Sequence, residues 1–238
     1  MIRVLRIRKY AYRTEQTYLH WAGRFARAQA GPGRAVADCG DAEIRDFLDE
    51  LAVKGEVSAS TQRQALNALV FLFREALKKE LGNFSDYQRA KAKSRLPVVL
   101  SRDEVQQLLT AMEGRLGLMA RVMYGSGLRL TELLRLRVKD VDLERRQLIV
   151  RFGKGGKDRG TPLAESLVEA LSGHLTVLRP LHERDRAENV AGVWLPPALG
   201  RKYPNAGREW GGQWLWPSRE LSVDPRGGEI RRHHVLDR

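Results

Sequence analysis

The chain has 238 residues, of which 42% are hydrophobic and 30% are charged, a composition typical of a folded globular protein and not of a disordered one. Lysine and arginine outnumber aspartate and glutamate by 42 to 29, so the formal net charge is +13. Both halves share this excess, with 18 basic and 11 acidic residues over 1–100 and 24 and 18 over 101–238. Both halves are therefore predicted to face one polyanion, and nucleic acid is the natural candidate.

No stretch approaches 18 consecutive apolar residues, and no long apolar run precedes a small-residue cleavage site near the first residue. We therefore expect neither a membrane span nor a secretory signal. The single cysteine, Cys39, cannot form an internal disulfide, which favours a cytoplasmic protein.

The first ninety residues predict a small helical domain. Residues 1–13 hold five basic side chains and no acid, and they form either an arm that contacts phosphates, with Arg13 at its end, or a merely solvated start. Three helices are expected to follow, with a fourth conceivable after Gly82. They are one with Tyr18, Trp21 and Phe25 on its inner face, one capped by Asp41, and one capped by Ser60.

A basic segment closes this domain. Residues 88–97 hold four basic groups, no acid and a final proline, which indicates a linker or, alternatively, an exposed helix end. We place the helical domain at 1–90, the linker at 91–97 and a second domain at 98–238. Three side chains of the linker are predicted DNA contacts: Lys91, Lys93 and Arg95. Ser101-Arg-Asp-Glu104 then forms a capping box that opens the second domain.

The second domain mixes helices and strands. Residues 116–136 predict two helices broken around Gly125-Ser-Gly127, and residues 147–151 predict a strand. A glycine turn at 153–157 leads to a return strand that begins at Thr161, and a helix is expected over 164–178. Residues 180–232 are rich in proline, glycine and tryptophan.

Two spots in this domain can carry chemistry. Arg129 begins a helix after a glycine turn, where a guanidinium can grip a phosphate and Glu132 can orient it, although the same spacing also suits a plain surface salt bridge. Lys154 and Lys157 lie on the glycine turn, which lacks Walker A spacing. A lysine at such a tip can enter a minor groove or protonate a leaving oxygen, or it can simply be solvated.

The order of these pieces resembles the tyrosine recombinases of the phage integrase family. The resemblance rests on the basic linker, Ser-Arg-Asp-Glu-Val, Gly-Ser-Gly-Leu-Arg-Leu-Thr-Glu and the strand before Gly-Lys-Gly-Gly-Lys. Residues 12–19, 60–69, 95–100 and 198–210 resemble the integron integrases, whose characteristic insertion would span about 180–234. The resemblance implies a mainly α fold with a small β-sheet: a SAM-like core-binding domain, then an incomplete mixed α/β catalytic domain.

The resemblance also implies a mechanism without metal or cofactor. In this family a tyrosine attacks the scissile phosphate and leaves a 3′-phosphotyrosine and a free 5′-hydroxyl. Two arginines stabilise the phosphoryl oxygens and a hairpin lysine protonates the leaving oxygen. The first arginine would be Arg129 and the lysine would be Lys154, with Lys157 as a DNA contact.

The sequence departs from the family in its second motif. None of the five histidines is followed three residues later by arginine, so the family's His-x-x-Arg box is absent from these residues. All six tyrosines lie upstream of where that box would stand, and Tyr124 matches a structural turn rather than the nucleophile. We therefore expect a C-terminally truncated integrase that does not cut DNA, which leaves its status as an enzyme uncertain.

The insertion suggests contacts to DNA, including folded single-stranded sites with extrahelical bases. Its candidate contacts are Lys202, Trp210, His233 and His234. The family commonly has Glu-Trp-x-Trp where this chain has Glu209-Trp-Gly-Gly212, so Trp214 and Trp216 would replace the lost stacking platform or pack in the core. We expect no metal at His233-His234, because no cysteine or carboxylate cluster completes a site.

Three functions remain open from the sequence. The chain is a DNA-binding integrase remnant, with full-length integrase protomers among its potential partners. Alternatively, it is an active recombinase completed by a missing or separately encoded C-terminal part. The third reading is a regulatory nucleic-acid-binding protein.

Overall fold

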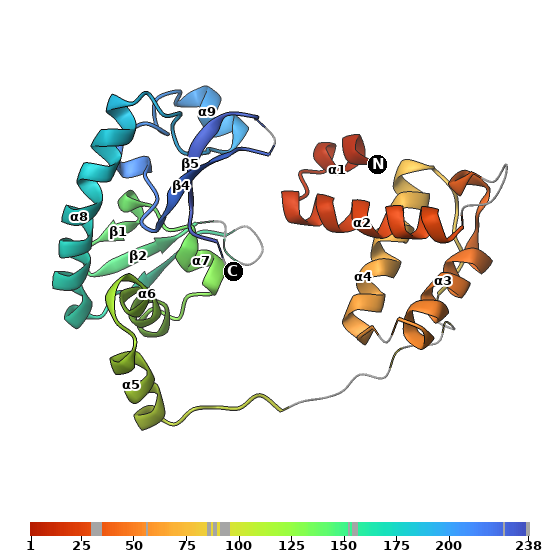
Figure 1. Cartoon of the computed structure of the whole chain (residues 1–238), viewed down its shortest axis with the longest axis horizontal. Helices are drawn as coiled ribbons and strands as arrows, with labels where there is room; N and C mark the ends of the chain where they lie inside the picture. The colour runs from red at the N-terminus through yellow and green to blue at the C-terminus, as the bar shows by residue number, and fades with distance from the viewer. Residues whose placement is uncertain are drawn as a thin grey trace. The chain divides into compact units, whose positions relative to one another are not determined.

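The computed structural model describes residues 1–29, 35–55, 57–84, 87, 90, 96–151, 153, 157–225 and 227–236. The chain divides into two compact units, Met1–Val98 and Val99–Arg238 (Figure 1), and each has its own apolar core. The predicted linker contacts Lys91, Lys93 and Arg95 lie outside the described residues, so the basic linker stays a prediction.

The first unit is helical in its described part. Its helices are α1 (Ile2–Ile7), α2 (Tyr12–Ala28), α3 (Asp41–Val53) and α4 (Ala59–Val70), which continues as a π-helical stretch over Phe71–Ala76. α2 and α3 both pack on α4. Trp21 and Phe25 are buried there, as their helical spacing predicted, together with Phe47 and Phe73.

Both predicted caps in this unit are wrong by one or two residues. Gly40 precedes α3 and donates its N–H to Glu43 at 2.7 Å, while Asp41 instead accepts a hydrogen bond from the Gly82 N–H at 2.8 Å. The N-cap of α4 is Ser58 and not Ser60, because the Ser58 hydroxyl oxygen accepts from the Thr61 N–H at 3.2 Å. Residues 81–84 carry no helix, so a fourth helix does not begin directly after Gly82.

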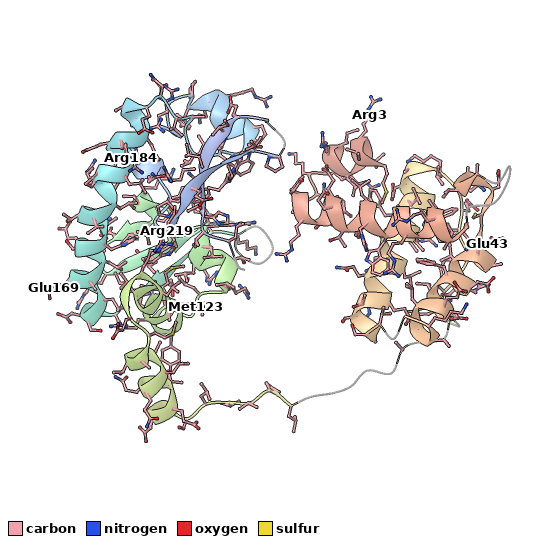
Figure 2. All side chains as sticks on the ribbon, viewed as in Figure 1. Arg3, Glu43, Met123, Glu169, Arg184 and Arg219 are labelled. Carbon is pink, nitrogen blue, oxygen red and sulfur yellow. The ribbon has the colours of Figure 1, made fainter. Side chains whose placement is uncertain are left out.

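The basic first residues are partly folded into α1, while their contact with phosphates stays a prediction. Leu5 of α1 is fully buried, Arg6 pairs with Glu15 at 3.0 Å, and Arg8 pairs with Glu75 at 2.5 Å. Arg3, by contrast, points away from the helices (Figure 2). Two of the five charges are thus already balanced by glutamates of the same unit, so the segment is not merely solvated.

The described part of the second unit combines α-helices with two small antiparallel sheets around one core. Its elements are α5 (Arg102–Ala111), α6 (Gly114–Gly125), α7 (Leu130–Leu134), β1 (Val141–Asp142), β2 (Gln147–Val150), β3 (Arg159–Pro162), α8 (Val168–Ala187), α9 (Pro197–Lys202), β4 (Pro217–Val223) and β5 (Ile230–His234). The capping box before α5 is confirmed: the Ser101 hydroxyl oxygen accepts from the Glu104 N–H, and the Glu104 carboxylate accepts from the Ser101 N–H.

The predicted hairpin is present with one correction. β1, β2 and β3 form an antiparallel sheet in that order, and the return strand begins at Arg159 rather than at Thr161, because Arg159 already pairs with Val150. Leu148 and Val150 of β2 point into the core, where they join residues of α7 and α8. α8 runs along the sheet in Figure 1.

α8 also differs from the prediction, which ended this helix at residue 178. It continues through Pro180 to Ala187. The extension is held by a buried ion pair, in which Arg232 of β5 donates to both carboxylate oxygens of Asp185 at 2.5 and 2.6 Å. Tertiary contact here outweighs the loss of one helical hydrogen bond at proline.

The predicted insertion holds a second antiparallel pair. In it, Leu221 of β4 faces Arg232 of β5, and Val223 faces Ile230. An isolated bridge between Arg137 and Trp214 connects the segment before β4 to the segment that follows α7. The insertion is thus packed into the second unit.

Candidate functional site

Arg129 lies in a tight turn between α6 and α7. The turn requires Gly127, whose φ is +59°, and the Leu128 N–H donates to the Met123 carbonyl at 3.0 Å. Leu128 and Leu133 are buried on either side of Arg129, so the backbone is fixed by the core. The side chain of Arg129 nevertheless remains 58% exposed.

Glu132 holds this arginine, as the spacing predicted. One Glu132 oxygen accepts from Arg129 Nη1 at 2.8 Å and the other accepts from the Arg129 backbone N–H at 2.9 Å. The contact is an i,i+3 salt bridge, but it is not a plain surface one, because the Glu132 side chain is only 7% exposed.

Arg159 is the partner that sequence reasoning missed. It donates Nη1 and Nη2 to the two oxygens of Glu132 at 2.9 and 2.8 Å, across 27 residues of sequence. This fork lowers the pKa of Glu132 to about 2, and the N–H groups of Arg129 support the shift while burial opposes it. No local spacing signals such a contact, and the predicted return strand began only at Thr161, two residues after Arg159.

The hairpin is fixed to the Arg129 turn at a second point. The Thr161 hydroxyl donates to the Ser126 carbonyl at 2.7 Å, and the Gly153 N–H donates to the Lys157 carbonyl at 3.0 Å to close the base of the loop. Lys157 is exposed there. Lys154, the predicted general acid, lies outside the described residues.

The two histidines of β5 lie in the same unit. His234 packs edge-on against Trp214, with ring centroids 5.1 Å apart, and its Nδ1–H donates to the Val235 carbonyl at 2.7 Å. Burial lowers the pKa of His234, and the nearby charge of Arg135 at the end of α7 lowers it further. Burial also lowers the pKa of His233, whose Nε2 has no hydrogen-bond partner among the described residues.

The tryptophans of the insertion mostly pack within the protein. Trp216 is fully buried, and Trp214 is buried between His234 and Arg137, whose guanidinium carbon lies 4.0 Å from the ring centroid. Neither is therefore an exposed stacking platform, and the alternative prediction that both pack in the core is confirmed. Trp210 is half-buried against α8, with the Arg179 guanidinium 4.1 Å from its ring centroid.

The remaining predicted contacts are on the surface. Arg13 is exposed in the first turn of α2, and Lys202 is exposed at the end of α9. Within the described part of the second unit, Lys202 makes no hydrogen bond or ion pair with Glu132 or its two arginines.

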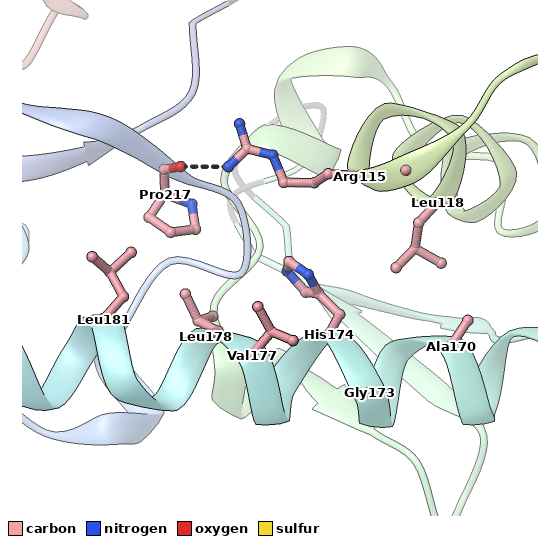
Figure 3. Close-up of a pocket in the computed structure, with 10 residues that line it drawn as sticks. Arg115, Leu118, Ala170, Gly173, His174, Val177, Leu178, Leu181 and Pro217 are labelled. Carbon is pink, nitrogen blue, oxygen red and sulfur yellow. Dashed lines mark hydrogen bonds between the residues drawn. The ribbon is translucent and has the colours of Figure 1, made fainter.

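A separate groove of about 400 Å³ lies between α6 and α8 (Figure 3). Arg115 borders it and donates to the Pro217 carbonyl at 2.9 Å, and His174 and Val177 line it from α8. None of its lining residues belongs to the cluster around Glu132. Among the described residues, no group of three histidine, cysteine or acidic side chains is placed to hold a metal, and no helix is long and apolar enough to cross a membrane.

Comparison with known proteins gives the class. The profile of the phage integrase N-terminal SAM-like domain matches residues 1–83, and that of the phage integrase family matches residues 98–190. Integrase/recombinase proteins of Escherichia coli and Pseudomonas aeruginosa are each 44% identical over 233 residues, which is 98% of this chain and 68% of each relative.

Solved structures give the same fold. The Tn1549 transposon integrase in complex with transposon right end DNA has a TM-score of 0.58 at 15% identity, over 90% of this chain and 69% of that one. The lambda integrase tetramer bound to a Holliday junction has a TM-score of 0.54 at 22% identity, over 74% of this chain and 52% of that one.

A SAM-like helical unit followed by an α/β unit is the architecture of an integrase. This chain belongs to the phage integrase family, the tyrosine recombinases. The predicted fold class, mainly α with a small β-sheet, is confirmed.

Proposed function

We propose that these residues are the DNA-binding part of a site-specific recombinase of the integron integrase type. One observation carries the proposal: the Glu132 carboxylate is shared by two arginines, so that one positive charge is left over at a partly exposed turn beside a lysine-bearing hairpin. A guanidinium held in this way suits a phosphate oxygen.

In this proposal Arg129 binds the scissile phosphate and stabilises the charge that develops on its oxygens. Lys154 of the hairpin protonates the leaving 5′-oxygen. Lys157, Arg13 and the linker residues Lys91, Lys93 and Arg95 contact flanking phosphates, which is supported by the sharing of the net charge of +13 between both halves.

We further propose that the 238 residues alone hold a DNA backbone without cutting it. They contain no His-x-x-Arg box, and all six tyrosines lie upstream of where that box would stand. A general acid and a phosphate clamp cannot cleave DNA without an attacking group. A second candidate is an active recombinase whose box and tyrosine come from a further segment or a separate polypeptide. It is favoured by the length of the 44% identical relatives, of which this chain spans 68%.

The integron type is the finer part of the proposal. The insertion, with His233, His234, Trp210 and Lys202 as its contacts, would recognise extrahelical bases of folded single-stranded sites. The lambda integrase, which has this fold, is described as a tetramer bound to a Holliday junction, which supports integrase protomers as partners. We propose that the protein works in the cytoplasm, where its single cysteine, Cys39, stays a buried free thiol.

Two binding experiments test this function. Gel shifts with a recombination-site duplex and with one strand of the same site, folded on itself, should both show binding that weakens steeply with salt. Preference for the folded strand supports the integron type, and equal affinity for unrelated duplexes supports a regulatory nucleic-acid-binding protein instead.

Cleavage is tested with a nicked suicide substrate. We expect a gel shift but no covalent protein–DNA band in denaturant. A covalent band that disappears when one of the six tyrosines is replaced by phenylalanine would show that the chain cuts DNA by itself.

A further inference from the structure

The carboxylate of Glu132 is fully occupied. Each of its two oxygens accepts two hydrogen bonds, one from Arg159 and one from Arg129, at 2.8–2.9 Å. A carboxylate offers about four lone-pair sites, so these four donors leave none for water. Its plane is therefore set by the two-pronged contact with Arg159.

The two arginines bind Glu132 in different ways. Arg159 uses both terminal nitrogens on Glu132, whereas Arg129 uses only Nη1 and its backbone N–H. Arg129 is also the more exposed of the two, at 58% against 38%. The Arg129 side-chain nitrogens that have no partner among the described residues, Nε and Nη2, are thus the ones available to an anion.

Arg159 also borders the hairpin loop. A Cβ added at Gly153 would lie 3.0 Å from Arg159 Nη1, so glycine at this position gives the guanidinium its room. The loop that begins at Gly153 is the one that contains Lys154. Arg159 therefore binds Glu132, the support of Arg129, and lies beside Gly153, the residue before Lys154 in sequence.

We infer that Arg159 is a positioning residue: it orients the Glu132 carboxylate, and through it the Arg129 guanidinium, for a DNA phosphate. The inference rests on the proposed function, in which Arg129 contacts that phosphate. Arg159 itself makes no phosphate contact in this arrangement, and its effect on binding passes through Arg129.

A double-mutant cycle on the whole chain tests this. Arg129→Gln and Arg159→Gln should each weaken binding of a duplex about tenfold and each lower the salt dependence by about one phosphate contact. The double variant should be no weaker than about tenfold, because both changes remove the same contact. Losses that multiply to about a hundredfold, with a salt slope lower by two contacts, would overturn the inference.

Arg159→Lys separates geometry from charge. Lysine keeps the positive charge but lacks the two-pronged fork. We therefore expect Arg159→Lys to bind the duplex less than threefold more tightly than Arg159→Gln, which is about tenfold weaker than the wild type. Full recovery would show that charge alone matters. Melting of each variant controls for misfolding, and Arg145→Gln, which removes an exposed arginine paired locally with Asp142, is the matched control.

A measurement without DNA keeps the two proposals distinguishable. The Glu132 carboxyl carbon, followed by NMR between pH 3 and 6, should stay ionised in the wild type and titrate at least about one unit higher in Arg159→Gln. An unchanged titration overturns the positioning role. If the wild type fails to bind any DNA while this shift is seen, the proposed function fails and the orientation of Glu132 by Arg159 stands.

Discussion

Two arginine clusters in the second unit use charge in opposite ways. Arg232 and Asp185 form one pair, with side chains 5% and 2% exposed, so that one positive charge meets one negative charge out of water. Around Glu132, two guanidiniums share one carboxylate, and both stay partly open to solvent. The first cluster is balanced and the second carries a spare positive charge.

The difference shows which arginines are free for a partner. Arg232 also donates to the carbonyls of Ser218 and Arg219 at 3.0 and 2.7 Å, so its donors are spent on joining β4 and β5 to α8. The side chain of Arg129 uses only Nη1 for hydrogen bonds to described residues, and it lies at an exposed turn. In a chain with 42 basic residues, the balance and burial of each guanidinium separate structural from binding roles better than the charge count does.

The largest effect is expected at the balanced pair. Asp185→Asn leaves a buried guanidinium without its counter-charge and should cost roughly 3–5 kcal/mol of unfolding free energy. Urea unfolding followed by tryptophan fluorescence measures this, since four of the five tryptophans lie in the second unit. The paired replacement Asp185→Leu with Arg232→Met should cost less than the single one, and a single variant as stable as the wild type would remove the contrast.

A smaller loss of stability is expected at the unbalanced cluster. Glu132→Gln removes the charge on which both arginines converge and should cost roughly 1.5–3 kcal/mol. It should also weaken DNA binding, because Arg129 loses its support even though the net charge rises by one. Gel shifts at fixed salt measure this. Tighter binding by Glu132→Gln would mean that total charge, and not position, governs affinity.

Local patterns predicted the parts of this site that lie close in sequence. The Gly125-Ser-Gly127 turn, Arg129 at a helix start, Glu132 three residues on and the hairpin all follow from short-range rules. Arg159 could not be found in this way, since its contact with Glu132 depends on how β3 packs beside α7.

Long-range contacts also explain the errors in the fold. Asp41 lost its expected capping role because its carboxylate accepts from Gly82, 41 residues away. The passage of α8 through Pro180 depends on Asp185 meeting Arg232, 47 residues away. Rules based on local spacing predict neither the contact with Gly82 nor the contact with Arg232.

A still smaller effect on stability is expected from a change of pH. This effect involves the histidines of the second unit and leaves the charge of the Glu132 cluster unchanged. Burial lowers the pKa values of His174, His233 and His234, so the unfolded chain binds more protons as pH falls below about 6.5. Stability is therefore full above that pH and decreases toward pH 5. Glu132, with its pKa of about 2, stays charged throughout.

Melting temperatures of the second unit between pH 7.5 and 5 check this direction. His174→Gln should flatten the profile, because its ring is held between Trp216, 4.6 Å away by ring centroids, and the Leu215 carbonyl. A wild-type melting temperature that does not change between pH 7.5 and 5 would show that these histidines bind protons as readily in the folded as in the unfolded chain.

The smallest effect is expected at Lys54, which is the proper reference for Arg129. It is exposed, and its ammonium lies 2.7 Å from Glu50, so it resembles Arg129 in having a glutamate partner on the same helix side. Its partner, however, is 55% exposed where Glu132 is 7% exposed, and no second cation shares it among the described residues. Water therefore screens the Lys54–Glu50 pair, and nothing fixes its geometry.

Lys54→Ala should leave the melting temperature unchanged and alter duplex affinity less than about twofold, whereas Arg129→Ala should weaken duplex affinity about tenfold at the same salt concentration. Equal losses in gel shifts would mean that each cation contributes only its charge, and the arrangement around Glu132 would then have no special role in binding.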